Sequence, residues 1–511
     1  MLLERSTSHA RGARFGSRSD ARDLRVRHIL TRRLVLGTWA TSRWRSTASM
    51  LAAPEGSSML ILGPTQSGKT SSLVLPALLS WEGPVLAASV KDDLVRGSVG
   101  WRERQGPVAV LDPSGAPVRL AGRYDPTAGS LDAQLARRRA ARLCADPDVL
   151  GGNDAHFWGQ LAAKQLAPLL LAANRIDGGI SRVEQWVDER AWSEPARVLE
   201  HSSELEALRW LDASLDRDER QRSSVSATLE AILSPFSGEV LGEPIDLDDL
   251  LSSSGSLYLC APAHDQRRLR PMFSAVTDEL IEKAFHRARI EGGRLKSPLL
   301  IILDEAAAIA PLDELDVLAA TCASHGITLV TCFQDLAQIE ARWGARAPTV
   351  VNNHTTRVLL SGLADRSARP TLEALVGSAP RRRGKTEAED LRPLIEADEL
   401  RRLPRFRGVV ISGRTAPIRL ALRPWWRLAP LRARGAAGEA RYASVDDSAS
   451  GGRGHRRHLD QGHPPRRRVP SSAFATDAAS GGARRGDRKG LRPLVRARSG
   501  LTGRRGIPRT P

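Results

Sequence analysis

The sequence predicts an α/β fold in which a mostly parallel sheet carries helices on both faces and an all-α segment interrupts the succession of strands. Short β-rich runs alternate with helical patterns over residues 57–426, which is typical of parallel strands joined by crossover helices. One of these runs leads directly into a glycine-rich loop at residues 63–70. Between residues 112 and 257 the strand signal is weak and the helical patterns are long. These three observations together predict the interrupted α/β fold.

The predicted elements follow from local patterns. The predicted strands are the β-rich runs at residues 59–62, 85–89, 108–112, 257–261, 299–304, 328–333, 358–361 and 409–412. The interruption contains helical patterns at residues 131–144, 155–174 and 223–233. A further amphipathic pattern is expected to pack back on the sheet, because its apolar residues recur near helical spacing. These residues are Phe273, Val276, Leu280, Ala284 and Phe285.

The charge of the chain is concentrated at its two ends. The chain has 511 residues and a formal net charge of +18, and a chain of this length rarely closes a single core. Residues 1–48 hold 11 Arg against 3 acids, and residues 430–511 hold 19 Arg plus Lys against 6 acids. Those ends carry +8 and +13, which leaves −3 for residues 49–429. The part between the ends is therefore near neutral.

The loop at residues 63–70, called the phosphate loop below, satisfies the pattern G-x-x-x-x-G-K-[ST]. In such a loop the backbone N–H groups converge on the β-phosphate at the positive end of the following helix. Lys69 then places a positive charge at the β- and γ-phosphates, and Thr70 offers a hydroxyl to Mg²⁺. The pattern predicts ATP and Mg²⁺ as ligands. The predicted nucleotide-binding residues are Gly63, Pro64, Thr65, Gln66, Ser67, Gly68, Lys69 and Thr70.

Two carboxylates end the most apolar predicted strand. Asp304 and Glu305 follow a run of aliphatic residues that starts at Leu299, and ligands bind at the carboxyl ends of parallel strands. Asp304 is predicted to hold Mg²⁺ through water, and Glu305 to orient or deprotonate the attacking water. These two residues complete the predicted hydrolytic site together with the phosphate loop.

A third polar residue ends the next predicted strand. Gln334 follows the run at residues 328–333, and a glutamine beside a γ-phosphate can position water or sense phosphate loss. The alternative is that Gln334 only begins the following helix, with Asp335 as its N-cap. Both interpretations of Gln334 stay open at this point.

These motifs divide the chain into five predicted parts. A basic N-terminal segment, ordered only in part, covers residues 1–48. The nucleotide-binding domain covers residues 49–125 and 246–429, and an all-α domain at residues 126–245 interrupts it. Residues 430–511, rich in Arg, Gly and Pro, form a predicted disordered tail. This tail is either an arm that adheres to nucleic acid or anionic lipid, or a solvated extension without a dedicated role.

Cysteine usage and hydropathy exclude other classes of protein. The four cysteines, Cys144, Cys260, Cys322 and Cys332, form no CxxC pair, so neither a disulfide framework nor a thiolate zinc site is predicted. No window approaches the roughly 18 uninterrupted apolar residues that a membrane-spanning helix needs. The first 30 residues lack the apolar core of a secretory signal. A cytoplasmic protein without a transmembrane helix in this chain is therefore predicted.

The motifs, in this order, resemble the coupling proteins of conjugative type IV secretion systems. The resemblance is to the TraG/TraD type, within the HerA/FtsK class of ring-forming DNA-pumping ATPases, and covers roughly residues 30–427. It extends beyond the nucleotide motifs. The segments that carry it are residues 63–70, 73–77, 83–94, 110–113, 157–158, 303–307, 352–357, 361–365 and 417–426, together with Gln334 and Gln338.

The resemblance implies a RecA-like P-loop NTPase core interrupted by an all-α domain. It also implies a homo-hexamer that couples ATP hydrolysis to the movement of single-stranded DNA with its attached relaxase, in contact with type IV secretion channel components. In such rings an arginine from the neighbouring subunit usually completes each catalytic site. Arg357, just before the predicted strand at residues 358–361, is the candidate, and the alternative is an ordinary surface arginine.

The sequence departs from the family in its membrane anchor. Proteins of this type usually begin with transmembrane helices, and no such helix is predicted here. Three interpretations stay open: a soluble member, a member docked on a separate membrane protein at the inner face of the cell membrane, or a gene model that lacks its start. The basic N-terminal segment is compatible with peripheral membrane association.

Two alternative functions stay open beside the coupling protein. One is a soluble HerA/FtsK-like motor for DNA or for protein export, which the missing transmembrane helices favour. The other is a DNA recruitment protein that does not hydrolyse ATP. The intact Lys69, Thr70, Asp304 and Glu305 argue against this second alternative.

Overall fold

The structure is a computed structural model that describes residues 13–30, 32–113, 119–146, 154–237, 242–363, 369–381 and 390–436. All of these ranges belong to one compact unit, Met1–Arg453. The second unit, Gly454–Pro511, lies outside the described residues, as does most of the predicted tail at residues 430–511.

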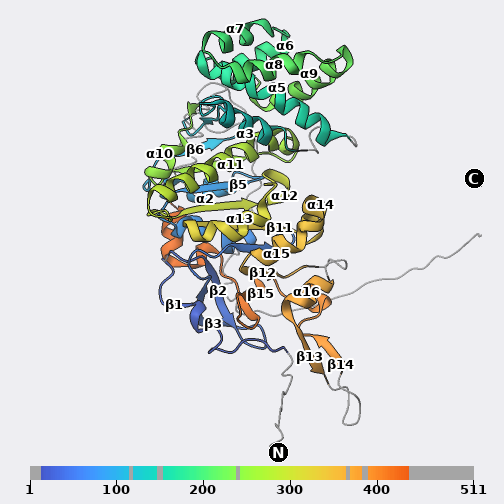
Figure 1. The fold of residues 1–511 in the computed structure, drawn as a ribbon. Helices are drawn as coiled ribbons and strands as arrows, with labels where there is room; N and C mark the ends of the chain where they lie inside the picture. Colours follow the sequence, from blue (N-terminus) through green and yellow to red (C-terminus); the bar gives the residue numbers. More distant parts are fainter. Residues whose placement is uncertain are drawn as a thin grey trace, which may run out of the picture. The chain divides into compact units, whose positions relative to one another are not determined.

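A single large sheet organises the described part of the chain (Figure 1). Its twelve strands run in the order β1-β3-β2-β16-β15-β12-β4-β11-β10-β5-β9-β6. The strands from β12 to β6 are parallel, and those from β15 to β1 pair antiparallel. The strands are β1 (Arg25–Val26), β2 (Val35–Ala40), β3 (Ser46–Ala52), β4 (Met59–Leu62), β5 (Val85–Ser89), β6 (Val108–Leu111), β9 (Ser256–Cys260), β10 (Leu299–Asp304), β11 (Ile327–Phe333), β12 (Thr356–Leu360), β15 (Arg407–Ser412) and β16 (Ile418–Ala421).

The mostly parallel α/β fold predicted from the sequence is confirmed, and every predicted strand is present within two residues of its predicted ends. Strands β1, β2, β3 and β16, which belong to the antiparallel edge of the sheet, were not predicted from the sequence. Two of these, β1 and β2, lie within the segment predicted as a partly ordered basic N-terminus. The arginines around β2 hid the strand, although four of its six residues are large or β-branched.

Glycine permits the close pairing of β2 with β16. Gly37 has a φ of +118°, and a Cβ atom at this position would lie 2.6 Å from the carbonyl oxygen of Ala421. Only a glycine adopts such a backbone without strain and admits the neighbouring strand so closely. Residue 37 also marks a register shift between β2 and β3, as expected for a β-bulge.

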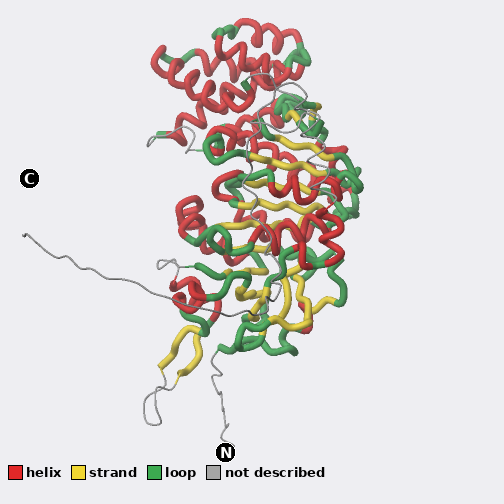
Figure 2. The backbone as a smooth tube through the Cα atoms, turned by 180° about the vertical axis from the view of Figure 1, so that it is seen from behind, coloured by secondary structure: helices red, strands yellow, loops and turns green. Residues whose placement is uncertain are grey.

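Helices cover both faces of the parallel strands (Figure 2). Met59 and Ile61 of β4 belong to one apolar core with α1 (Leu75–Ser80) and α2 (Asp93–Arg102). Leu60 and Leu62 point the other way, into a core shared with helices such as α11 (Gln266–Ile290) and α13 (Leu315–Thr321). Successive side chains of a strand face opposite ways, so burial on both faces requires the continuous apolar runs seen in this sequence.

A run of helices interrupts the strands, as the sequence predicted. Long α5 is buried along most of its length and packs against α3, α6, α7, α8 and α9. These helices gather at the top of Figure 1. They are α3 (Ala133–Leu143), α5 (Ala155–Arg175), α6 (Gly179–Asp188), α7 (Ser193–His201), α8 (Leu205–Leu215) and α9 (Glu219–Leu233).

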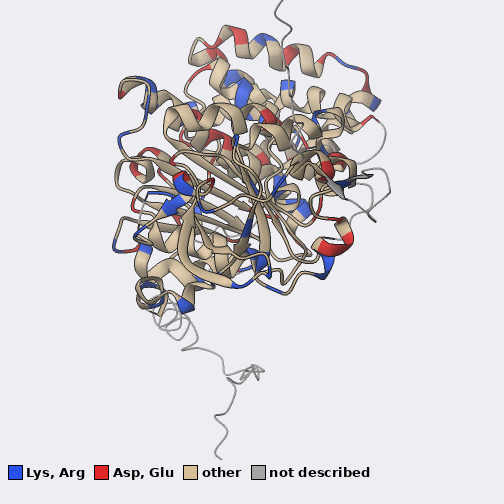
Figure 3. Ribbon diagram, turned by 90° about the horizontal axis from the view of Figure 1, so that it is seen from below, with Lys and Arg blue, Asp and Glu red and all other residues tan. Residues whose placement is uncertain are grey.

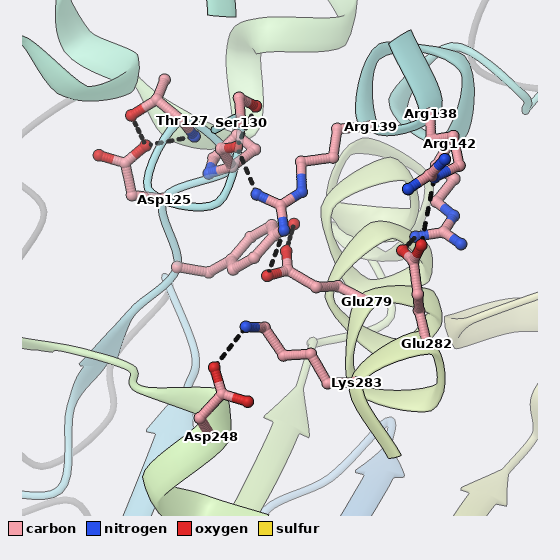
Figure 4. A network of polar contacts seen from close by, with 12 residues as sticks. Asp125, Thr127, Ser130, Arg138, Arg139, Arg142, Asp248, Glu279, Glu282 and Lys283 are labelled. Atoms are coloured by element: carbon pink, nitrogen blue, oxygen red, sulfur yellow. Dashed lines mark hydrogen bonds and ion pairs between the residues drawn. The ribbon is translucent and has the colours of Figure 1, made fainter. Parts of the chain in front are cut away.

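A buried ion pair fastens this run of helices to the sheet-covering helix α11 (Figure 4). Arg139 of α3 lies 2.6 Å from a carboxylate oxygen of Glu279 of α11, and both side chains are less than a tenth exposed. The hydroxyl of Tyr124 donates to the other oxygen of Glu279 at 2.9 Å. Removing one partner from such a buried pair typically costs about 3–5 kcal/mol, because the other charge is left uncompensated.

The remaining α-helices and β-strands of the described residues lie outside the twelve-stranded sheet. They are β7 (Gly122–Arg123), β8 (Glu243–Pro244), β13 (Ser378–Arg381), β14 (Asp390–Pro393), α10 (Leu247–Ser252), α12 (Ala306–Ile309), α14 (Ala337–Trp343), α15 (Ala347–Asn353), α16 (Arg369–Val376) and α17 (Ala397–Arg402). Among the described helices, none combines the length and the hydropathy needed to cross a bilayer. Positively and negatively charged residues are interspersed along the ribbon of the described chain (Figure 3).

The folded part continues past the predicted start of the tail. Residues 429–436 are helical, and Leu431 is fully buried in the core. Arg434 donates to the carbonyl oxygen of Leu79 at 2.6 Å and lies 3.5 Å from the ring centroid of Trp101. The predicted boundary at residue 430 is therefore too early, and a predicted disordered tail can apply only to residues outside the described ranges.

Candidate functional site

The register of the parallel strands brings the predicted site residues to one edge of the sheet. Phe333 of β11 pairs with Leu62 of β4, and Cys332 of β11 pairs with Asp304 of β10. The phosphate loop follows Leu62, and Gln334 follows Phe333. Sequence-distant motifs therefore meet where parallel strands end, which is where such sheets bind ligands.

The phosphate loop curls tightly between β4 and the next helix. Gly68 has a φ of +102°, a conformation that favours glycine, and Gln66 at the exposed tip has a φ of +63°. A Cβ atom at Gly63 would lie 2.8 Å from Cβ of Leu360, so this glycine lets β12 approach the start of the loop. The helix then begins with a π-helical turn, Thr70–Val74, a form that is frequent at functional sites.

Lys69 and Thr70 both point into the structure. The Lys69 side chain is buried, and its ammonium group donates to the carbonyl oxygen of Gly63 at 2.5 Å. The Thr70 hydroxyl donates to Oδ2 of Asp304 at 2.9 Å, from a segment 234 residues away in the sequence. The structure thus joins the two predicted metal-binding residues directly.

The charge of Asp304 is only partly compensated. Its Oδ1 atom is buried and has no hydrogen-bond partner among the described residues. Burial raises the pKa of Asp304 to about 6, although the Thr70 hydrogen bond and the Lys69 charge act in the opposite direction. A buried carboxylate oxygen beside a threonine hydroxyl fits Mg²⁺, which prefers oxygen ligands and would supply the missing positive charge.

Glu305 and Gln334 also lie together. Gln334 Nε2 donates to Oε1 of Glu305 at 3.3 Å. The backbone of Glu305 is left-handed, with a φ of +69°, and strain of this kind in a non-glycine residue is concentrated at functional sites. Gln338 Oε1 accepts from the Gln334 backbone N–H at 2.9 Å, and Asp335 caps the turn by accepting from Gln338 N–H at 3.0 Å.

Asp93 is a further carboxylate at this edge to which the sequence analysis gave no role. It begins α2 just after β5, the neighbour of β10, and its Oδ1 atom is buried without a partner among the described residues. Burial raises the pKa of Asp93, and its charge helps to raise the pKa of Asp304. The signal available in the sequence was the Lys-Asp-Asp run at residues 91–93, which follows a predicted strand.

Arg357 is not brought to the phosphate loop of its own chain. It pairs with Leu60 in the register, nearer the start of the parallel strands than their carboxyl ends. Its guanidinium donates to the carbonyl oxygens of Val351 and Asn352 at 2.9 and 2.8 Å, and burial lowers its pKa. Within this chain Arg357 stabilises the end of α15, as a cation at a helix C-terminus does.

The buried carboxylate of Asp146 lies outside the predicted site. It links the end of α3, in the helical run, to arginines near the polar residues of the site. Asp146, just past α3, lies 3.4 Å from Arg270 of α11 and 3.3 Å from Arg342 of α14. Arg270 also donates to the carbonyl oxygen of Ala308 at 3.1 Å, three residues after Glu305. No sequence motif marks Asp146, because its partners come from distant segments.

Comparisons with known proteins agree with this geometry. A family model described as type IV secretory system conjugative DNA transfer matches residues 19–448. Two proteins from Escherichia coli, each called conjugal transfer protein TraG, are 26% and 24% identical over 322 and 410 residues, or 56% and 68% of this chain. The matched regions are 49% and 62% of those relatives, so the chain spans about half to three fifths of their length.

Solved structures of a coupling protein share the fold. The bacterial conjugative coupling protein TrwBdeltaN70 in an unbound form is 16% identical with a TM-score of 0.58, over 81% of this chain and 93% of that one. The plasmid coupling protein TrwB in complex with the GTP analogue GDPNP has a TM-score of 0.60 at 16% identity, over 81% of this chain and 94% of that one. TrwB in complex with ADP and Mg²⁺ has a TM-score of 0.59 at 16% identity, over 81% of this chain and 93% of that one.

The resemblance inferred from the motifs is thereby confirmed. The RecA-like P-loop fold implied by that resemblance agrees with the shared fold of the coupling protein. The family model covers most of the folded unit, including the phosphate loop and the carboxylates opposite it. This chain belongs to the family of type IV secretory system conjugative DNA transfer proteins.

Proposed function

We propose that this chain hydrolyses ATP to drive single-stranded DNA, with an attached relaxase, to the channel of a type IV secretion system. The observation that carries the proposal is the hydrogen bond from Thr70 to the buried Asp304, whose other carboxylate oxygen has no hydrogen-bond partner among the described residues. It joins a phosphate-binding loop to a carboxylate that needs a cation, within a chain of the conjugative DNA transfer family.

The site residues have separate roles in this mechanism. The backbone N–H groups of the phosphate loop bind the phosphates, and Lys69 exchanges its bond with Gly63 for phosphate oxygens. Thr70 and Asp304 would hold Mg²⁺, which would supply positive charge against the β- and γ-phosphates. Glu305 orients the attacking water and accepts its proton. Gln334, held against Glu305, reports whether the γ-phosphate is present.

The assembly is also part of the proposal. We infer a homo-hexamer in which a neighbouring subunit supplies an arginine to each site. Arg357 remains the candidate, and it would have to leave its carbonyl partners on α15 to act in this way. The all-α domain at residues 126–245, a cytoplasmic location at the inner face of the cell membrane and contacts with channel components complete the proposal.

Nucleotide turnover by the full chain tests this function. ATP hydrolysis should be measurable with purified protein, should rise with single-stranded DNA, and should fall to background in Lys69→Ala. Lys296→Ala is the matched control, because this exposed lysine lies outside the site. If the unmodified protein hydrolyses no more ATP than Lys69→Ala, with or without DNA, the proposed motor function is wrong.

A further inference from the structure

An aromatic side chain that the mechanism does not use lies against the phosphate loop. A Cβ atom added at Gly68 would lie 2.8 and 2.9 Å from Cδ1 and Cε1 of Phe406. Both atoms belong to one edge of the ring, so Phe406 touches the loop edge-on. The ring is partly exposed. Gly68 is therefore required both for its own backbone and for the approach of this ring.

Phe406 is held in an unfavourable backbone conformation. Its φ is +65°, which is an outlier for a bulky residue. The conformation is held by its neighbours, because the Phe406 carbonyl oxygen accepts from Leu422 N–H at 3.0 Å and from Arg407 Nη1 at 2.9 Å. Arg407 is fixed in turn by the carbonyl oxygen of Trp44. Such strain persists where surrounding structure enforces it, and it is concentrated at ligand sites.

A cation accompanies the ring. The guanidinium carbon of Arg405 lies 4.8 Å from the ring centroid of Phe406, within the range of a cation–π contact. Arg405 is exposed. The guanidinium lies over the aromatic ring, so the two groups form a stack to which a second planar group can add on an outer face, because both groups stack on π-systems.

The order of strands places Arg405 and Phe406 on the side of β4 away from Asp304. Asp304 at the end of β10 and Gln334 just after β11 lie on one side of β4, whereas β12 and β15 lie on the other. Gly408 of β15 pairs with Leu360, the last residue of β12, so Phe406 lies beyond the carboxyl end of β12. Two strand spacings, about 10 Å, separate β15 from β4, a distance that a nucleoside triphosphate can bridge.

We propose that Arg405 and Phe406 form the shelf on which the base of the bound nucleotide stacks. This inference rests on the proposed function, which places the triphosphate on the phosphate loop. A nucleotide whose γ-phosphate faces Asp304 and Gln334 extends its other end across β4 toward β12 and β15, where the pair lies. Stacking depends on the flat π-face of a base and not on the hydrogen-bonding groups at its edge. The shelf therefore accepts adenine and guanine alike.

Binding measurements on the full chain separate contact with the base from support of the loop. Phe406→Leu keeps an apolar side chain beside Gly68 but removes the aromatic face. It should weaken binding of Mg²⁺–ATP and Mg²⁺–GTP by roughly 5- to 100-fold, the range typical of one base–aromatic stack. Inorganic tripolyphosphate, which has no base, should bind the variant within twofold of the unmodified protein.

Conservative and matched variants complete the test. Phe406→Tyr should retain nucleotide affinity, and Arg405→Gln should weaken it without affecting tripolyphosphate. Arg414→Gln, an exposed arginine in the turn at the other end of the same hairpin, should change neither. Equal loss of tripolyphosphate and ATP in Phe406→Leu, or unchanged ATP affinity, would overturn the shelf. Failure of the proposed function is distinct, because the unmodified protein would then bind or hydrolyse no nucleotide.

Discussion

Thr70 and Asp304, 234 residues apart in the sequence, are joined by a hydrogen bond of 2.9 Å that links the phosphate loop to the end of β10. The bond satisfies one oxygen of Asp304 and leaves the other without a partner among the described residues. In the proposed mechanism the two side chains would hold Mg²⁺, an ion that prefers oxygen ligands.

The first prediction concerns the Thr70 hydroxyl. Thr70→Val keeps the shape of the side chain but removes the group that contacts both Asp304 and the cation. We expect turnover to fall on the order of 100-fold, by analogy with the loss of one preorganised hydrogen-bond donor from an oxyanion hole. Thr70→Ser, which retains the hydroxyl, should keep most of the activity. Steady-state ATP hydrolysis over a Mg²⁺ titration measures both, and equal activity of Val and Ser variants would contradict the assignment.

The second prediction separates binding from hydrolysis at Glu305. Glu305→Gln retains the size and the hydrogen-bonding capacity of the side chain but cannot accept a proton. Nucleotide should still bind, whereas turnover should fall by about 10²- to 10⁴-fold, as for loss of a general base. Glu340→Gln, an exposed glutamate on α14, is the control. Equilibrium binding of a fluorescent ATP analogue and single-turnover hydrolysis would show the separation, and full turnover in Glu305→Gln would refute the role.

Much of this site could be predicted from the sequence because local patterns determine it. A strand that runs into residues 63–70, and another that ends at Asp304, each reveal both chemistry and position. Long-range pairing could not be predicted in this way. The β2–β16 contact joins Thr38 to Ala421, 383 residues away, and the arginines around β2 conceal its strand pattern. The approach of Phe406 to Gly68 likewise depends on where the β15–β16 hairpin returns along the sheet.

The third prediction concerns coupling between the site and the helical run. Asp146 is only 6% exposed and contacts Arg270 and Arg342. Arg270 contacts α12, the helix after Glu305, and Arg342 lies on α14, the helix that follows Gln334. Asp146→Asn weakens both ion pairs without touching the nucleotide-binding residues. We expect DNA-free ATP hydrolysis to be retained and its stimulation by single-stranded DNA to be lost.

The control for Asp146 is an ion pair of the same type at the surface of the helical run. Glu204→Gln removes the partner of Arg175, which joins α5 to the start of α8, and exposed pairs contribute little. The ratio of hydrolysis rates with and without DNA, measured for each variant, checks the prediction. A ratio in Asp146→Asn equal to that of Glu204→Gln would show that Asp146 serves only the packing of α3.

The last prediction is a pH dependence of stability that originates in His354. This side chain is fully buried, contacts Thr331 Oγ1 at 3.0 Å and the carbonyl oxygen of Val350 at 2.7 Å, and has Arg357 nearby. Burial, with a smaller contribution from Arg357, lowers the pKa of His354 to about 4. The unfolded chain therefore binds the proton more tightly than the folded chain between about pH 6.5 and pH 4.

Folding stability due to His354 is consequently complete above pH 6.5 and is lost as the pH falls toward 4, by about 3 kcal/mol in total. Asp304 and Asp278, whose pKa values are raised to about 6 by burial, act in the opposite direction over the acidic part of this range. Comparing the unmodified protein with His354→Gln cancels these contributions, because both proteins retain the two carboxylates. Denaturant unfolding at pH 7 and pH 5 should show a stability difference between the two proteins that shrinks at pH 5. A difference independent of pH would mean that His354 binds its proton equally well in the folded and unfolded chains, and would contradict the lowered pKa of the buried side chain.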